Sequence, residues 1–316
     1  AWDNNYPSGV QLFAIEDFKA QQDNYNFFKF AHDLAIVEPL EHSDSYNEQC
    51  YQYFKEIKFH LDIYKRYPSL MPNYVDPTTI SALEDEMKLF IKQRFEDVVD
   101  KDELNLTVKI DNAFTQFFDK LFDATADTTF ITTNYDFIIE KIIHNTSANV
   151  SLNRGVIDKK QFADKSWQND KVNVFKLNGG FEISQDHNGS YIDYNHNSHT
   201  PNIILPSQEQ NYNEPYFDNI FIKSAAKLRG ADLLVFIGYS FPEEDHTIRF
   251  LLKNFSDSHN KNKEIVIIGR NIGSATATKA NACKLFPYLA DKEAIYAFDG
   301  ELNDLLIQGV NSKLIK

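Results

Sequence analysis

Residues 127–140 read Asp-Thr-Thr-Phe-Ile-Thr-Thr-Asn-Tyr-Asp-Phe-Ile-Ile-Glu, and they are the strongest indication of the fold class. A β-rich apolar run stops at small polar residues, and a helical apolar pattern comes after them. In α/β proteins such junctions form ligand sites, because small side chains and open helix N-termini meet beyond the carboxyl ends of parallel strands. The stretch therefore predicts a strand near 128–133, a helix near 135–145 and a functional junction between them.

A second junction of the same kind occupies residues 232–246, Asp-Leu-Leu-Val-Phe-Ile-Gly-Tyr-Ser-Phe-Pro-Glu-Glu-Asp-His. Gly238 and Ser240 end its apolar run, where backbone N–H groups and a hydroxyl can contact a phosphate or a ribose. A rival interpretation is the nucleophile elbow of a hydrolase, with Ser240 as the nucleophile. That motif needs a glycine two residues after the serine, where Pro242 stands. The acidic residues before His246 are typical of a helix N-terminus.

From Thr128 onward, short apolar runs alternate with helical patterns, which predicts an α/β, Rossmann-like parallel sheet with crossover helices. The predicted strands lie near 128–133, 172–177, 202–205, 232–238, 263–268 and 293–298. The predicted helices lie near 135–145, 214–229, 244–255, 273–284 and 301–308.

The N-terminal third reads as helical, because apolar residues recur there at steps of three and four. A capping-box pattern, Ser81-Ala-Leu-Glu84, predicts the opening of one of its helices. We therefore expect a mainly helical lobe over residues 1–125, with the edge of the nucleotide-binding fold at 1–20. A Rossmann-type domain is expected over 126–316.

Composition disfavours several classes of function. The formal net charge of −14 disfavours a general nucleic-acid role, which draws on clustered Lys and Arg. The two cysteines, Cys50 and Cys283, are far apart and lack metal-ligand spacing, so no disulfide framework and no metal site are predicted. There is no apolar run of membrane-spanning length and no leader pattern, so we expect no membrane partner and a cytoplasmic location.

Three motifs together resemble those of bacterial sirtuin-like proteins. Thr132-Thr-Asn134-Tyr-Asp136 resembles their Thr-Thr-Asn-Tyr-Asp motif, and Gly238-Tyr-Ser240-Phe resembles their Gly-Tyr-Ser signature. Between them, Lys-Leu-Asn178-Gly stands where the family writes Lys-Leu-His-Gly. The resemblance covers residues 126 to 300 and implies an NAD-binding fold. It also implies hydrolysis of NAD to nicotinamide and ADP-ribose, which such proteins use in antiphage defence in prokaryotes.

The resemblance assigns roles to the first junction. In the family the asparagine at the position of Asn134 is catalytic, and its amide can donate and accept hydrogen bonds to water and ribose. Asp136 can accept from a ribose hydroxyl or from a backbone N–H. Thr133 and Gly179 are candidate NAD contacts beside them. The alternative for Asn134 and Asp136 is a strand-to-helix cap with no ligand.

Asn178 replaces the histidine that would act as a general base, and an amide has no useful basicity. Two explanations stay open. Either the site binds NAD or an ADP-ribose derivative without turnover, as a degenerate nucleotide-binding sensor, or another residue supplies the base. The possible substitutes lie on or beside the polar segment 181–201, namely Glu182, His187, His196 and His199.

A third strand end, residues 265–271, reads Ile-Val-Ile-Ile-Gly-Arg-Asn and lies where sirtuin-like folds meet the adenosine half of the dinucleotide. Arg270 can pair with a phosphate, including the 2′-phosphate of an NADP-like ligand, or with a surface carboxylate. Asn271 can contact the ligand or cap the helix expected near Gly273.

The resemblance also sets limits. Protein-deacylating sirtuins carry a zinc module of four cysteines, which two distant cysteines cannot form, so deacetylation is disfavoured. Tyr6-Pro-Ser-Gly-Val-Gln-Leu12 resembles the segment that comes after the family's glycine-rich loop. That loop is expected just upstream of residue 1, unless this member lacks it. A homo-oligomer, a partner defence protein and a scaffold role for the aromatic-rich helical lobe all remain open.

Overall fold

The chain forms two compact units in the computed structural model. Unit 1 comprises residues 1–105, 134–138 and 178–212, and unit 2 comprises residues 106–133, 139–177 and 213–316. The predicted domain boundary at residue 125 stays a prediction. The structure describes residues 9–15, 18–98, 113–124, 127–146, 152–156, 172–187, 189–194, 199–207, 210–242, 245–256 and 262–300.

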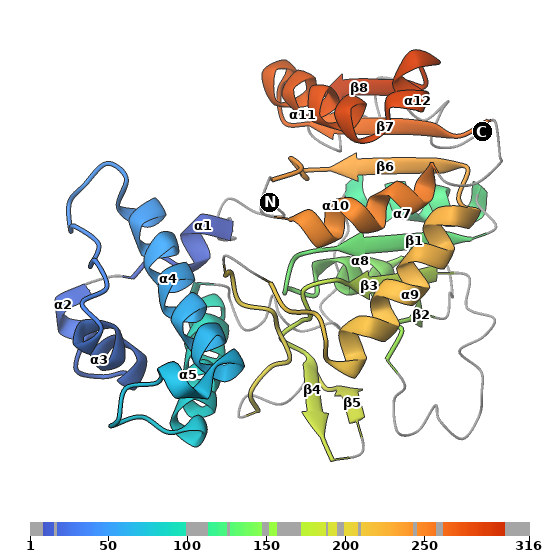
Figure 1. Cartoon of the computed structure of the whole chain (residues 1–316). Helices are drawn as coiled ribbons and strands as arrows, with labels where there is room; N and C mark the ends of the chain where they lie inside the picture. The colour runs from blue at the N-terminus through green and yellow to red at the C-terminus, as the bar shows by residue number, and fades with distance from the viewer. Residues whose placement is uncertain are drawn as a thin grey trace. The chain divides into compact units, whose positions relative to one another are not determined.

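Unit 1 is largely helical, as the apolar spacing of the N-terminal third predicted (Figure 1). Its helices are α1 (Gly9–Leu12), α2 (Phe18–Gln21), α3 (Asn26–Asp33), α4 (Tyr46–Arg66), a 3₁₀ turn (Pro68–Leu70) and α5 (Pro77–Val98). Aromatic side chains fill its core. The ring centroid of Phe27 lies 5.7 Å from that of Phe54 and 5.6 Å from that of Phe90. The antiparallel hairpin of β4 (Ile183–Asp186) and β5 (Gly189–Ile192) belongs to the same unit.

Helix α5 begins at Pro77 rather than at the predicted capping box. The Oδ1 atom of Asp76 accepts a hydrogen bond from the backbone N–H of Thr79 at 2.8 Å and so satisfies a donor of the first turn. Glu84 is buried instead, and its carboxylate forms ion pairs with lysines of α4 and α5. The prediction of a helix start at Ser81 is therefore wrong.

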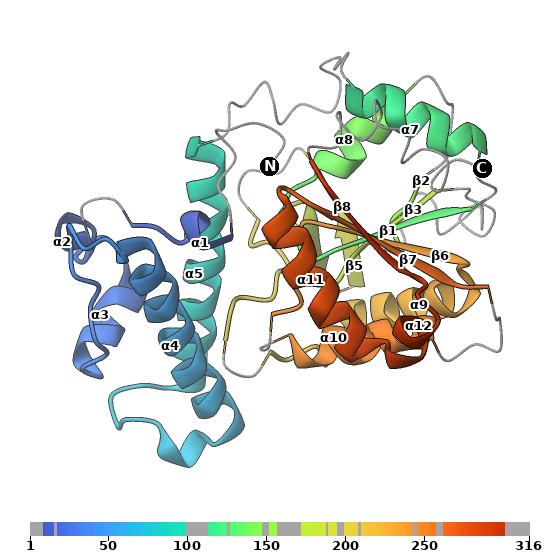
Figure 2. The same cartoon turned by 90° about the horizontal axis from the view of Figure 1, so that it is seen from above.

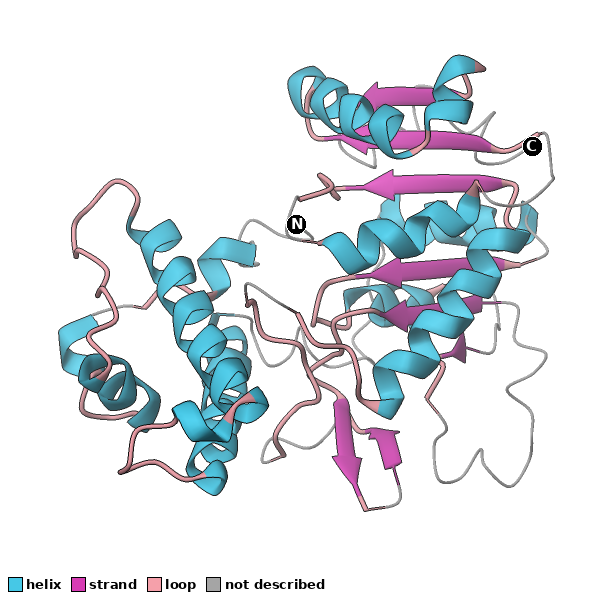
Figure 3. Ribbon diagram, viewed as in Figure 1, coloured by secondary structure: helices cyan, strands magenta, loops and turns pink. Residues whose placement is uncertain are grey.

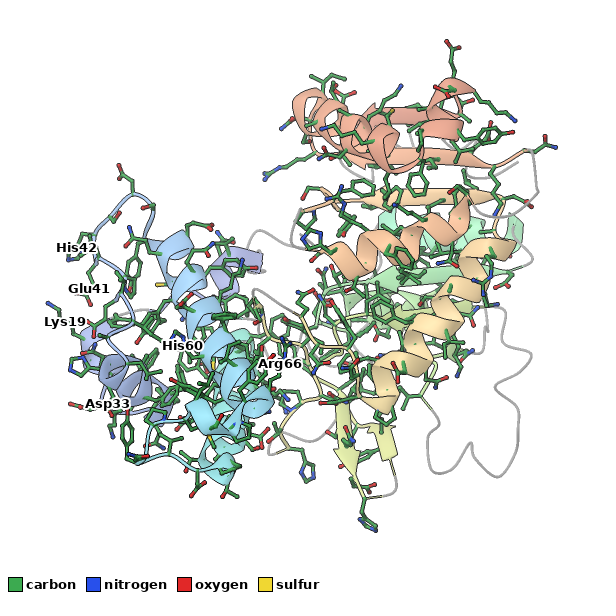
Figure 4. All side chains as sticks on the ribbon, viewed as in Figure 1. Lys19, Asp33, Glu41, His42, His60 and Arg66 are labelled. Atoms are coloured by element: carbon green, nitrogen blue, oxygen red, sulfur yellow. The ribbon has the colours of Figure 1, made fainter. Side chains whose placement is uncertain are left out.

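Polar and charged side chains surround the aromatic core of this helical part. Figure 4 labels six of them on α2 to α4 and the adjoining loops, namely Lys19, Asp33, Glu41, His42, His60 and Arg66. Cations and anions are interspersed among them, which is typical of a solvated surface rather than of a nucleic-acid site.

Unit 2 carries the parallel strands that the sequence predicted (Figure 3). Its elements are α7 (Ala113–Ala124), β1 (Thr128–Thr132), α8 (Ile138–Asn145), β2 (Leu152–Asn153), β3 (Val172–Lys176), α9 (Pro215–Gly230), β6 (Leu233–Ile237), α10 (His246–Leu252), a 3₁₀ turn (Lys253–Phe255), β7 (Glu264–Gly269), α11 (Ile272–Leu285), α12 (Pro287–Asp291) and β8 (Ile295–Asp299), with Ile138 of α8 counted in unit 1. The strands form two three-stranded parallel sheets, ordered β1-β3-β2 and β6-β7-β8. Helices α7 and α8 lie on one side of the strands, and α9 and α10 on the other (Figure 2).

The strand predicted over residues 202–205 does not form. Only an isolated bridge between Ile203 and Gly179 is present there, so that prediction is wrong. Pro201 and Pro206 flank this segment and lack the N–H groups that would extend a ladder. The helix predicted over 301–308 lies outside the described residues.

Candidate functional site

Five of the predicted site residues belong to unit 2, where they lie just beyond the carboxyl ends of its strands. Thr133 continues β1, Gly238 and Ser240 follow β6, and Arg270 and Asn271 follow β7. Strands β6 and β7 are paired, with Ile237 opposite Ile268, so the last two groups leave neighbouring strands at the same edge. This is the edge at which α/β folds bind ligands.

The turn after β6 is open at its glycine. Gly238 has a φ of +70°, and no atom lies within 4 Å of the position that a Cβ would occupy. Ser240 is exposed, and its backbone carbonyl accepts a hydrogen bond from the side-chain amide of Asn281 at 3.1 Å. This arrangement leaves the backbone of Gly238 and the hydroxyl of Ser240 accessible to a ligand.

Phe241, which sequence reasoning did not single out, is held in a left-handed conformation with a φ of +59°. This conformation costs about 1–3 kcal/mol for a residue other than glycine. Phe241 is buried, and its ring centroid lies 4.6 Å from that of Phe236 on β6 and 5.1 Å from that of Tyr239. The aromatic packing thus holds a strained turn beside Gly238 and Ser240.

Arg270 and Asn271 differ in how they are engaged. Arg270 is exposed, and no ion pair joins it to the residues that the structure describes. The side chain of Asn271 accepts a hydrogen bond from the backbone N–H of Ser274 at 2.9 Å, while Ser274 accepts from the backbone of Asn271 in return. Asn271 therefore caps α11, whereas Arg270 presents a cation to solvent.

The first junction continues from Thr133 into unit 1. Asn134 is exposed. The Oδ1 atom of Asp136 accepts a hydrogen bond from the backbone N–H of Ile138 at 3.0 Å, so Asp136 caps the first turn of α8. The structure therefore shows Asp136 as a helix cap, which was one of its two interpretations. Of the two side chains, that of Asn134 is the more accessible.

The turn at Asn178, Gly179 and Gly180 is fixed by the segment after the hairpin. The backbone N–H of Ile204 donates to the carbonyl of Asn178 at 2.9 Å, and that of Gly180 donates to the carbonyl of Asn202 at 3.3 Å. Gly179 has a φ of +78°, and a Cβ there would stand 1.9 Å from the carbonyl oxygen of Asn202. Only glycine fits at this position.

The side chain of Asn178 is buried and engaged. It is 9% exposed, and its Oδ1 atom accepts a hydrogen bond from the hydroxyl of Tyr212 at 2.9 Å. The same hydroxyl lies 2.7 Å from the Oε1 atom of Gln210. Sequence reasoning did not identify Tyr212, because nothing in the chain marks a partner so distant from Asn178.

Three of the four candidate substitutes for the missing histidine belong to the described residues, and these three lie in different surroundings. Glu182 is 1% exposed, and its two carboxylate oxygens lie 2.5 and 2.8 Å from where a Cβ of Gly180 would stand. His187 and His199 are exposed, and His196 lies outside the described residues. Glu182 is therefore the candidate whose carboxylate the structure places against the Asn178–Gly180 turn.

A buried ionic cluster in unit 2 was missed by the sequence analysis, although two of its members belong to the quoted motifs. The carboxylate of Glu140 on α8 lies 2.7 Å from the guanidinium of Arg154 and 3.1 Å from the ammonium of Lys176 on β3. All three side chains are at most 6% exposed. The pair of Glu140 and Lys176 ties the helix after the first motif to the strand before the Asn178 turn.

The described part of the chain shows no metal centre. Within it, no three His, Cys, Asp or Glu side chains are grouped so as to hold a metal ion. The same residues include no helix that is both long and apolar enough to cross a membrane.

Comparison with known proteins identifies one family. The model of the SIR2-like domain matches residues 128–291, which is more than half of the 316 residues. The match spans all three motifs, from β1 through the Asn178 turn to α11 and α12. No curated protein matches the chain.

Proposed function

The chain belongs to the SIR2-like domain family, and from this premise we propose that it binds NAD and hydrolyses it to nicotinamide and ADP-ribose. Membership of this family supports an NAD-type ligand. We further propose that the reaction serves prokaryotic antiphage defence by depleting NAD.

The residues present suit such a ligand. Gly238 leaves room for close approach to its backbone, and Arg270 offers an exposed cation that can pair with a phosphate. The accessible amide of Asn134 carries the proposal for chemistry, because it can hold a water molecule and a ribose hydroxyl at the same time. Asp136, which caps α8, would hold the loop of Asn134 in place.

A second function, binding of NAD or an ADP-ribose derivative without turnover, is favoured by one observation. Asn178 stands at the histidine position of the family motif, is buried, and accepts a hydrogen bond from Tyr212. A side chain with no basicity that is also engaged with a phenol cannot remove a proton from water. On this alternative, the chain is a nucleotide sensor.

The two functions are separated by measuring nicotinamide release and NAD binding on the same preparations. Chromatography follows release, and calorimetry follows binding. For the hydrolase we expect release that falls by at least about 100-fold in Asn134→Ala, in line with the loss of one group that stabilises a transition state. Asn47→Ala is the matched control, because Asn47 is an exposed asparagine on α4.

The variant Asn178→His completes the test. Binding without release in the natural chain, with release restored in Asn178→His, would establish the sensor and show that only the base is missing. If neither release nor binding of NAD is detected in any variant, both functions are wrong.

A further inference from the structure

Tyr135 follows Asn134 directly in the first motif and is held both by its backbone and by its side chain. Its backbone carbonyl accepts a hydrogen bond from the N–H of Phe181 at 3.0 Å. Its hydroxyl donates to the backbone carbonyl of Ile204 at 2.5 Å. Both partners belong to unit 1, as Tyr135 does. The residue next to Asn134 is therefore bound at two points by the segment that carries Asn178.

The two partners of Tyr135 lead to the Asn178 turn in one step each. Phe181 comes directly after Gly180, the last residue of the turn. The backbone N–H of Ile204 donates to the carbonyl of Asn178 at 2.9 Å. The two motifs thus bind the carbonyl and the N–H of the same residue, Ile204. A continuous chain of hydrogen bonds therefore runs from the hydroxyl of Tyr135 through one peptide segment to the backbone of Asn178.

Aromatic packing in the helical lobe supports this connection. The ring centroid of Phe181 lies 5.6 Å from that of Tyr135 and 4.9 Å from that of Phe95 on α5. Phe181 and Phe95 are buried in the core of the lobe, and Tyr135 packs partly buried against the same core. Because a close-packed interior leaves a side chain few alternative rotamers, the ring of Tyr135 is held in one orientation.

We propose that Tyr135 is a positioning residue, which holds the Asn134 loop to the Asn178 turn so that the two motifs act on NAD together. This inference rests on the proposed function, because Tyr135 acts through the neighbouring amide of Asn134 and takes no part in proton transfer. A displacement of about 1 Å at a group that contacts the reacting atoms can lower a rate about 100-fold. Loss of the Tyr135 hydroxyl should therefore impair turnover beyond its effect on stability.

The helical lobe contains a matched control for this hydroxyl. Tyr135→Phe removes the hydroxyl and keeps the ring. The hydroxyl of Tyr46 donates to the backbone carbonyl of Ile15 at 2.7 Å, and Tyr46 also packs partly buried against the core of the lobe. Tyr46→Phe therefore removes the same kind of hydrogen bond from the same unit, outside both motifs. We expect thermal unfolding to show similar decreases in midpoint for the two variants.

Hydrogen exchange, resolved by residue, tests the connection between the motifs without NAD. We expect the amides of Phe181 and Ile204 to exchange about tenfold faster or more in Tyr135→Phe than in the natural chain, as the loss of one buried hydrogen bond implies. In Tyr46→Phe the same two amides should keep their natural rates. Unchanged exchange in Tyr135→Phe would overturn the proposal. Equal acceleration in both variants would also overturn it, because the effect would then reflect global stability.

Steady-state kinetics of nicotinamide release test the consequence for NAD. We expect Tyr135→Phe to lower kcat by about tenfold to 100-fold with a much smaller change in KM. Tyr46→Phe should leave kcat within about twofold, because a substitution at a distant site acts independently. Release that is equal in the two variants would refute the positioning role and leave NAD hydrolysis established.

A chain that binds NAD without turnover calls for the same comparison in a second background. Tyr135→Phe and Tyr46→Phe are then each combined with Asn178→His, which supplies the family's base. A fall in kcat confined to the Tyr135→Phe combination supports the positioning role, and equal rates in the two combinations refute it. If the Asn178→His variant itself releases no nicotinamide, the hydrolase and the positioning role are both wrong.

Discussion

The hydroxyl of Tyr212 donates a hydrogen bond to the Oδ1 atom of Asn178 at 2.9 Å, and both side chains are buried. This contact fixes the amide at the position where the family motif has histidine. It joins the turn after β3 to the segment before α9, which sequence alone does not connect. The pair therefore explains how an asparagine can be accommodated at the centre of the motif.

Tyr212→Phe removes the donor and leaves the buried oxygen of Asn178 without this partner. A buried acceptor that loses its hydrogen bond costs about 1–3 kcal/mol, so we expect a loss of that size in the free energy of unfolding. Urea denaturation measures it. The matched control is Tyr67→Phe, because Tyr67 is 49% exposed; it should change stability by less than about 0.5 kcal/mol. Equal effects of the two variants would contradict the prediction.

The buried cluster of Glu140, Arg154 and Lys176 predicts a large effect of charge removal. Lys176→Met removes one of the two cations that pair with the carboxylate of Glu140 in this cluster, and that side chain is 2% exposed. Breaking a buried pair from one side costs about 3–5 kcal/mol, because a charge is left without compensation. Lys227→Met is the control, since its pair with Asp127 is 35% and 53% exposed and should contribute less than about 1 kcal/mol. Thermal unfolding that ranks the two variants in the reverse order would refute this account.

Alanine substitutions at two glycines with positive φ distinguish the cost of backbone strain from the cost of a steric clash. At Gly189, with a φ of +116°, a Cβ meets no atom within 4 Å, so Gly189→Ala should cost only about 1–3 kcal/mol of backbone strain. At Gly179 a Cβ would stand 1.9 Å from the carbonyl oxygen of Asn202. We therefore expect Gly179→Ala to destabilise the chain by clearly more than Gly189→Ala, or to prevent folding. Comparable unfolding midpoints would show that the segment around Asn202 moves aside.

Much of the parallel sheet could be predicted because each strand is a short apolar run that ends at Gly or small polar residues. The strand predicted over residues 202–205 is wrong, because Ile203 and Leu205 are apolar for another reason: they pack in the core of the helical unit. The contact between Tyr212 and Asn178 and the pair of Glu140 and Lys176 could not be predicted. Periodicity identifies which residues are buried, but not which distant residue meets them.

The electrostatics of the helical lobe predict how stability depends on pH. Burial alone would raise the pKa of Glu84, but the ammonium groups of Lys58, Lys88 and Lys65 outweigh it and lower this pKa from 4.5 to about 2. A lowered folded-state pKa stabilises the fold above the unfolded value, and the contribution is lost as the pH falls from about 4.5 to about 2. The shift corresponds to about 3 kcal/mol.

The difference in unfolding free energy between the natural chain and Glu84→Gln should therefore shrink as the pH is lowered through this window. Urea titrations at several pH values between neutrality and 2.5 measure it. Glu48→Gln, at an exposed position on α4, serves as the control for the general effect of removing a carboxylate. A difference that stays constant across the window would show that the three lysines do not act on Glu84.

Arg270 provides a direct test of ligand binding at the end of β7. Its guanidinium is exposed and forms no ion pair with described residues, so no carboxylate among those residues competes with a phosphate for it. A charge-assisted hydrogen bond contributes about 1.5–3 kcal/mol, and Arg270→Ala should raise the dissociation constant for NAD about tenfold or more. Arg249→Ala on α10 controls for the loss of one positive charge. Calorimetry that gives the same NAD affinity for both variants would mean that Arg270 does not contact the ligand. A loss of NAD affinity in Arg270→Ala alone, with an unchanged free energy of unfolding, would assign the phosphate contact to the end of β7, which the sequence identified.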